Sequence, residues 1–146
     1  MKRDSVDTHR TDQARFADAL SCVDLAVRAP VGREEAPMIF ITAKFLIKAT
    51  DADRWPQIAA TFTAATRAEP GCLWFDWSRS VDNPDEYVLV EAFRDGEAGA
   101  AHVGSAHFKQ AQQDLPAHLV ATPKIISQAV DQDDWSELGE LAVPGQ

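Results

Sequence analysis

The segment EPGCLWFDWSRSVDNPDEYVLVEAFRDGEAGAAHVGSAHF, residues 69–108, carries most of the information about the fold. Its pattern predicts the end of a helix, a turn at Pro70-Gly71, two strands and a helical region with two histidines. The three residues at 82–84, Asp-Asn-Pro, are turn formers between two apolar runs. We therefore expect residues 72–81 and 86–94 to pair as an antiparallel hairpin, with any chemistry beside it.

Both faces of this hairpin are expected to carry large apolar groups, because successive strand side chains point to opposite faces. In the first strand, one row is mostly apolar and the other mixes Trp74 with polar groups. The expected rows are Leu73, Phe75, Trp77 and Val81 against Cys72, Trp74, Asp76, Ser78 and Ser80. In the second strand they are Val88, Val90 and Ala92 against Tyr87, Leu89, Glu91 and Phe93.

The bulk composition is that of a globular chain with one main domain. It has 146 residues, 45% hydrophobic and 25% charged, with a net charge of -9. This acidic balance, without any basic cluster, argues against nucleic acid and anionic membranes as partners. The longest apolar run, residues 38–47, is interrupted by Lys44 and is far shorter than the roughly 20 residues of a membrane helix.

The two cysteines, Cys22 and Cys72, show neither the spacing of a metal site nor a disulfide framework. We interpret both as reduced thiols, which are typical of a cytoplasmic protein. The N-terminus has charges but no apolar segment of the secretory type. The expected location is therefore the cytoplasm.

Residues 1–37 differ from the rest in having scattered charges and few aromatic residues, and we expect a partly helical or disordered extension there. Phe16, Leu20, Val23 and Val27 form a helical stripe within it. The alternative is a dispensable leader, with Met38 as the functional start. Residues 38–131 are the expected domain, and residues 132–146 an acidic tail with one helical turn around Trp135–Leu138.

The order of elements in residues 38–131 predicts the fold. A strand at 38–47 is followed by a helix ending at Glu69, with Asp53 as the preferred cap; the hairpin comes next. Asp95 and Ser105 are expected caps of two helical segments, residues 96–102 and 106–115. A last strand is expected at 123–130. The result is β-α-β-β-α-β, a ferredoxin-like α+β fold with an antiparallel sheet.

Two helices cover only one face of such a sheet, and we expect the other face to need a partner. A large aromatic side chain on an uncovered face forfeits much of the free energy of its burial. Self-association through the open face is the simplest solution, and it predicts a homodimer. The pocket is then expected between each sheet and its own helices, or at the subunit edge.

The hairpin and the helical region together resemble the antibiotic biosynthesis monooxygenase (ABM) domain family, in particular its small quinol monooxygenases. The resemblance covers residues 38–130. Its most specific parts are Glu69-Pro70-Gly71, the strand with Glu91, and Ala101-His102 followed by Ser105-Ala-His107-Phe108.

The resemblance implies a dimeric α/β barrel that oxidises a small aromatic quinol or phenol with O₂. It also implies that no metal, flavin or haem cofactor takes part, because the deprotonated substrate itself supplies the electrons. The protein would provide a base, hydrogen bonds to the phenolate and a dry aromatic pocket.

On this resemblance, His107 and His102 are the candidate bases, and Glu91 would orient a histidine or hold the phenolic proton. The alternative for each histidine is a structural bond at a helix end, and the alternative for Glu91 is an ion pair with Arg79. A metal site of two histidines on one helix is not indicated, because the two are five residues apart across Gly104.

Aromatic side chains near these residues are candidates for binding the substrate, although aromatic residues in strands are more often simply core. The candidates, with one arginine, are Trp74, Trp77, Tyr87, Phe93, Phe108 and Arg79. Two other functions stay open. One is isomerisation of a small ketone by the same histidines and Glu91, and the other is a non-catalytic module that binds a small apolar ligand.

Overall fold

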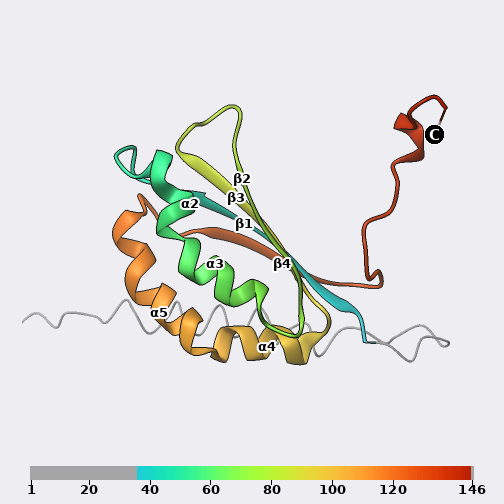
Figure 1. Cartoon of the computed structure of the whole chain (residues 1–146), viewed down its shortest axis with the longest axis horizontal. Helices are drawn as coiled ribbons and strands as arrows, with labels where there is room; N and C mark the ends of the chain where they lie inside the picture. The colour runs from blue at the N-terminus through green and yellow to red at the C-terminus, as the bar shows by residue number, and fades with distance from the viewer. Residues whose placement is uncertain (1–35, 146) are drawn as a thin grey trace, which may run out of the picture.

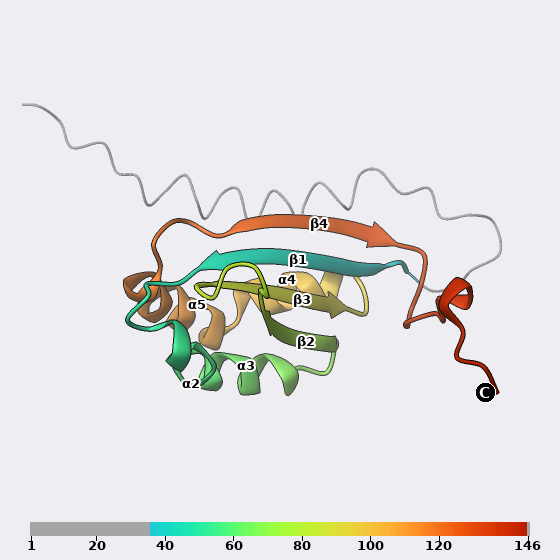
Figure 2. The same ribbon diagram turned by 90° about the horizontal axis from the view of Figure 1, so that it is seen from above.

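The computed structural model describes residues 36–145, in which a four-stranded antiparallel sheet carries the fold. The strands lie in the order β2-β3-β1-β4, as Figure 2 shows from above. Their bounds are Met38–Leu46 for β1, Cys72–Arg79 for β2, Glu86–Phe93 for β3 and Lys124–Val130 for β4. Each predicted strand is present, and each ends within about two residues of its expected bounds.

The helices lie on one face of the sheet (Figure 1), and they fill the two crossovers. Between β1 and β2 come the short 3₁₀ turn η2, Ala52–Arg54, then α2, Trp55–Ile58, and α3, Ala60–Arg67. Between β3 and β4 come α4, Gly96–Gly104, α5, Ala106–Asp114, and the 3₁₀ turn η3, Leu115–His118. The predicted ferredoxin-like α+β fold is confirmed.

The predicted caps of the second crossover are confirmed. The Asp95 side chain accepts a hydrogen bond from the backbone N–H of Ala98 at 2.8 Å, and the Ser105 hydroxyl accepts one from Phe108 at 3.1 Å. In the first crossover the predicted cap at Asp53 is wrong. Asp53 lies inside η2 and forms an ion pair with Arg79, and no side chain caps α2.

The expected alternation of β2 fails at its start, because a bulge shifts the register between Cys72 and Trp74. Cys72 lies opposite Phe93, and Phe75 lies opposite Glu91, so both face the helices. An extra residue in one strand reverses the side-chain parity on one side of the bulge. The expectation that Cys72 shares a face with Trp74 is therefore wrong, whereas Phe75 and Trp77 do share one.

The core lies between the sheet and the helices and consists of three neighbouring clusters. The largest surrounds Trp55 and Tyr87, near the end of β1. The other two surround Phe93, with Ile39 and Ile41, and Phe75, with Leu89. The second and third clusters adjoin the histidines described below.

The opposite face of the sheet is more open. Ile126 in β4 is 63% exposed, and Val88 and Val90 in β3 are only half-buried. Part of this face has a partner within the chain, because the ring of Trp135 lies 5.5 Å from that of Trp74. Within residues 132–145 the helical turn, η4, is at Gly139–Leu141 and not at the predicted Trp135–Leu138.

Two expectations concern other parts of the chain. The helix predicted from Phe16 to Val27 lies outside the described residues. Among residues 36–145, the structure has no helix that is both long and apolar enough to cross a membrane.

Candidate active site

A carboxylate and two imidazoles meet where the α3–β2 turn approaches α4 and α5. Glu69 Oε1 lies 2.7 Å from His102 Nδ1 and 2.5 Å from His107 Nε2. An ionised carboxylate has no proton to donate, so both ring nitrogens must act as the donors. This assigns the tautomers: in neutral rings, the free lone pairs are on His102 Nε2 and His107 Nδ1. We call Glu69, His102 and His107 the EHH cluster.

The turn after α3 fixes Glu69. Its backbone N–H donates to the Thr66 carbonyl, and its carbonyl accepts from the N–H of Cys72. The turn then passes so close to α4 that a Cβ added at Gly71 would lie 2.3 Å from the Cβ of Ala98. Glycine at position 71 therefore allows the contact that holds the carboxylate against the histidine helices.

The break between α4 and α5 brings the two histidines together. Within one continuous helix, residues five positions apart do not share a face. Here α4 ends at Gly104 and Ser105 caps a new helix, so His102 and His107 belong to different helices and both reach Glu69. The sequence predicted this break, and the expectation that one helix does not carry a two-histidine metal site left open a site formed by two helices.

Aromatic rings enclose His102, which is 2% exposed. Phe93 stacks on it with centroids 4.7 Å apart, and Phe108 lies edge-on at 5.0 Å. Phe62 and Phe75 complete this surround. Burial lowers the pKa of His102 against the opposing effect of Glu69, so its imidazole is held neutral.

His107 is the more accessible of the two, with 24% of its side chain exposed. It shares the Glu69 oxygen with His102, and its ring lies 6.3 Å from that of Phe62. A small molecule entering from the solvent would therefore contact His107 before His102.

Glu91 is a second carboxylate on the same face of the sheet. It lies in β3 directly opposite Ile41 and Phe75, which are core residues, and it is 4% exposed. Its Oε2 atom is buried and has no hydrogen-bond partner among the described residues. Burial, with a smaller contribution from the charge of Glu69, raises the pKa of Glu91 to about 8. The side chain is therefore a largely neutral acid at pH 7.

The alternative interpretation of Glu91, an ion pair with Arg79, is wrong. Arg79 Nη1 lies 2.8 Å from Asp53, its Nε–H donates to the Pro84 carbonyl, and its guanidinium lies over the Tyr87 ring. Arg79 is thus at the hairpin end of β2, away from Glu91 in the register.

The structure divides the predicted aromatic residues into two groups. Phe93 and Phe108 contact His102. The remaining three lie elsewhere. Tyr87 donates its hydroxyl to the Ala52 carbonyl in the Trp55 cluster, Trp77 donates its indole N–H to the Thr63 hydroxyl, and Trp74 faces the open side of the sheet.

Sequence reasoning missed Glu69 as a functional residue. It identified Glu69 as the end of a helix and as part of the most specific motif, but assigned the carboxylate role to Glu91. The available signal was a carboxylate directly before the Pro70-Gly71 turn, where the chain reverses toward the sheet. What the sequence did not reveal is that α4 and α5 place both histidines at that turn.

The EHH cluster has the composition of a metal site, since one ligand atom from each residue lies within 4.8 Å of the others. A pocket of about 340 Å³ lies elsewhere, at the start of β1, and is lined by Ala36, Pro37, Met38, Leu73, Arg94, Asp95, Asp131, Gln132 and Asp133. This lining includes no member of the cluster.

The sequence profile of the family described as "Antibiotic biosynthesis monooxygenase" matches residues 38–114, which is 77 of the 146 residues. The chain therefore belongs to the ABM family. The matched range includes the whole EHH cluster and Glu91. A comparison with curated proteins gave no match.

Solved structures show that the fold is shared with other proteins. A Nitrosomonas europaea protein provisionally named an antibiotic biosynthesis monooxygenase is 21% identical, with a TM-score of 0.60, over 66% of this chain and 93% of that one. A Caulobacter crescentus protein with the same provisional name is 22% identical, with a TM-score of 0.62, over 66% and 92%. A Mycobacterium tuberculosis protein is 24% identical, with a TM-score of 0.60, over 66% and 99%.

Proposed function

We propose that this protein is a monooxygenase that oxidises a small aromatic quinol or phenol with O₂ and without a cofactor. The observation that carries the proposal is the Glu69 carboxylate shared by two imidazoles, at 2.7 and 2.5 Å. An imidazole bonded to a carboxylate in this way is an oriented base. The carboxylate fixes the tautomer of the ring and stabilises the imidazolium that forms when the ring takes a proton.

His107 is the proposed base. Its Nε2–H donates to Glu69, which leaves the Nδ1 lone pair free to accept the phenolic proton. His102 is enclosed by aromatic rings and does not contact the substrate in this proposal. Its Nδ1–H donates a second hydrogen bond to Glu69 and holds the carboxylate in place. Residues 38–131 form the proposed catalytic domain.

The deprotonated substrate supplies the electrons. A phenolate transfers one electron to O₂, and the phenoxyl radical and superoxide then combine at a ring carbon. Loss of water from the resulting hydroperoxide gives a quinone, so that one oxygen atom enters the ring and the other leaves as water. A hydroquinone instead gives the quinone and H₂O₂, so with this substrate the same base supports an oxidase reaction and only the phenol reaction is a monooxygenation. In either case the redox balance closes with substrate and O₂ alone.

Glu91 and the surrounding rings are proposed to bind the substrate. A neutral carboxyl can donate a hydrogen bond to the oxygen that becomes the carbonyl, and Glu91 Oε2 is buried without a partner among residues 36–145. Phe93 and Phe108 offer flat apolar walls beside His102. Trp74, Trp77, Tyr87 and Arg79 would then act in packing, or at a subunit edge.

The protein is further proposed to be a cytoplasmic homodimer that pairs through the open face of the sheet. The support is the apolar surface of that face, where Ile126 is 63% exposed and Val88 and Val90 are half-buried. Cys72 is a free thiol, which fits a reducing compartment.

Oxygen uptake by the EDTA-treated chain with menadiol tests the proposal, with 1-naphthol as the phenol and heavy-isotope O₂ as the tracer. We expect enzyme-dependent uptake with both substrates, and one labelled oxygen atom in the quinone formed from naphthol. Uptake unaffected by His107→Ala would reject the proposed base.

The two alternative functions give different results. An isomerase would convert a small hydroxyketone under nitrogen as fast as under air. A binding module would bind menadione saturably and show no turnover of any substrate. Either result would refute the monooxygenase.

A further inference from the structure

The EHH cluster has a second chemical capability that base catalysis does not use. Its ligand atoms are two imidazole nitrogens and one carboxylate oxygen, all within 4.8 Å of one another. Two histidines and one carboxylate are the ligand set of many catalytic zinc sites and of mononuclear iron sites. The three side chains come from three different elements, the α3–β2 turn, α4 and α5, which pack on one another.

The distances suit an ion after a small movement. Zinc bonds of about 2.0–2.2 Å in tetrahedral geometry place ligand atoms roughly 3.3 Å apart. Glu69 Oε1 lies 2.7 and 2.5 Å from the two nitrogens, so it would need to withdraw by less than about 1 Å. The two ring nitrogens lie within 4.8 Å of each other, and rotation of both imidazoles together with the carboxylate would bring the three ligand atoms to this spacing.

The surrounding charges also favour a cation. Glu69 is an enclosed carboxylate, with 14% of its side chain exposed, and within residues 36–145 no lysine or arginine pairs with it. The nearby arginines are engaged elsewhere, since Arg67 pairs with Asp76 and Arg94 with Asp95. Buried carboxylates are normally paired or bound to a metal.

We propose that Glu69 Oε1, His102 Nδ1 and His107 Nε2 form a binding site for one divalent transition-metal ion, with zinc as the representative ion, and that an occupied site is inhibited. The inhibition rests on the proposed function, whereas the metal site does not. A metal on His107 Nε2 leaves the ring proton on Nδ1, the atom that must accept the phenolic proton. Zinc and base catalysis therefore exclude each other.

Isothermal titration calorimetry of ZnCl₂ into the tag-free, EDTA-treated full chain tests the site, and we expect one ion bound per chain. Thermal unfolding with and without zinc should show a higher melting temperature with zinc. MgCl₂ should not bind at concentrations where zinc saturates, because magnesium prefers an all-oxygen shell. His107→Gln and Glu69→Gln should each weaken zinc binding at least about tenfold, the lower bound seen even when residues around a site are altered.

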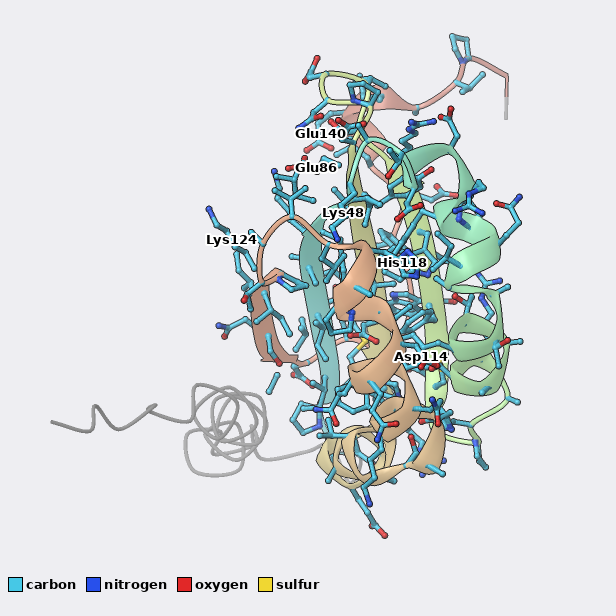
Figure 3. All side chains as sticks on the ribbon, turned by 90° about the vertical axis from the view of Figure 1, so that its left-hand side faces the viewer. Lys48, Glu86, Asp114, His118, Lys124 and Glu140 are labelled. Atoms are coloured by element: carbon cyan, nitrogen blue, oxygen red, sulfur yellow. The ribbon has the colours of Figure 1, made fainter. Side chains whose placement is uncertain are left out.

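His118→Gln is the matched control. His118 also pairs with a carboxylate, Asp51 at 2.9 Å, but it lies in η3 beside Lys48 at the end of β1 (Figure 3). We expect its zinc affinity to equal that of the unaltered chain. A site lost in His118→Gln and retained in His107→Gln would overturn the proposal, as would no zinc binding or equal binding of magnesium.

Cobalt gives a second readout that needs neither turnover nor a stable His102 variant. Co²⁺ should produce visible absorption bands in the unaltered chain and in His118→Gln, and the bands should be absent in His107→Gln. Identical spectra in all three would overturn the site. Zinc binding in a chain that oxidises no quinol would support the metal site and count against the proposed function alone.

Discussion

Glu69 Oε1 and His102 Nδ1 lie 2.7 Å apart, although 33 residues separate the two in the chain. The turn that carries Glu69 reaches α4 because Gly71 has no side chain to keep the helix away. The same carboxylate oxygen accepts a second bond from His107. The fold thus assembles the EHH cluster from segments that are far apart in sequence.

The two histidines should respond differently to replacement by alanine. His107→Ala should lower turnover about 100-fold or more, the usual contribution of a general base, with only a small loss of melting temperature. His102→Ala removes a ring that is 2% exposed between Phe93 and Phe108, and should cost about 2–4 kcal/mol of stability. Steady-state oxygen uptake and thermal unfolding measure the two effects.

His118→Ala is the control for that pair, because His118 is outside the EHH cluster and bonds Asp51. Its turnover should stay within about twofold of the unaltered chain. If His107→Ala lost as much stability as His102→Ala, His107 would be a structural residue and not the base.

Glu91 should make the protein less stable as the pH rises. The pKa of Glu91 is about 8 in the folded chain against an ordinary value of 4.5, so between these values the folded state holds one proton more than the unfolded state. This contribution is complete below pH 4.5. It should fall by about 1.4 kcal/mol per pH unit inside the window and be lost above pH 8.

Glu91→Gln replaces the acid with a neutral side chain of the same shape, and should flatten this dependence. Urea unfolding at a series of pH values between 5 and 8 measures it. Glu140→Gln, at an exposed residue of the tail that Figure 3 labels, should leave the slope unchanged. A slope that persists in Glu91→Gln would place the titrating group elsewhere.

Gly71 and Gly104 should differ sharply on replacement by alanine. A Cβ at Gly71 would lie 2.3 Å from the Cβ of Ala98, so Gly71→Ala must push α4 away and should cost about 1–3 kcal/mol. Apart from its chain neighbours and the backbone of its own helix, no atom lies within 4 Å of a Cβ built at Gly104 in α4, and Gly104→Ala should be neutral or stabilising by up to about 1 kcal/mol. Chemical denaturation measures the free energy of unfolding of both variants. Equal values for Gly71→Ala and Gly104→Ala would refute the close contact at Gly71.

The open face of the sheet should control association. Ile126→Asp places a charge on that face, where Ile126 is 63% exposed, and should convert the proposed dimer to monomers. Val81→Asp is the matched change at a residue that is 98% exposed in the β2–β3 turn, and should leave the dimer intact. Sedimentation velocity measures both. A monomeric unaltered chain would rule out the dimer.

Much of the fold could be predicted from local sequence. Alternation gave the strands, the Asp-Asn-Pro turn gave the hairpin, and Asp95 and Ser105 gave the caps of α4 and α5, because each of these signals depends on near neighbours in the chain. The errors occurred where tertiary contacts decide. Asp53 pairs with Arg79 and does not cap a helix, and the bulge moves Cys72 to the helix face.

The candidate site could be predicted only in part, for a related reason. Phe93, Phe108 and His107 were expected at the same site as His102, and their ring centroids lie 4.7, 5.0 and 6.0 Å from that of His102. The role of Glu69 depends on how a turn packs against two helices, which no periodicity reveals. Phe93 touches the site, whereas Tyr87, further back on the same strand, bonds Ala52. Which aromatic residue of β3 reaches the site thus also depends on how the helices pack on the strand.

Glu69→Gln keeps the shape of the side chain and removes the charge that both histidines share. The rate of enzyme-dependent oxygen uptake with menadiol, compared between this variant and the EDTA-treated unaltered chain, therefore tests the proposed base most directly. We expect a fall of about 100-fold or more, with Glu137→Gln in the exposed tail unchanged. A folded Glu69→Gln chain that retains full oxygen uptake would contradict a catalytic role for the cluster.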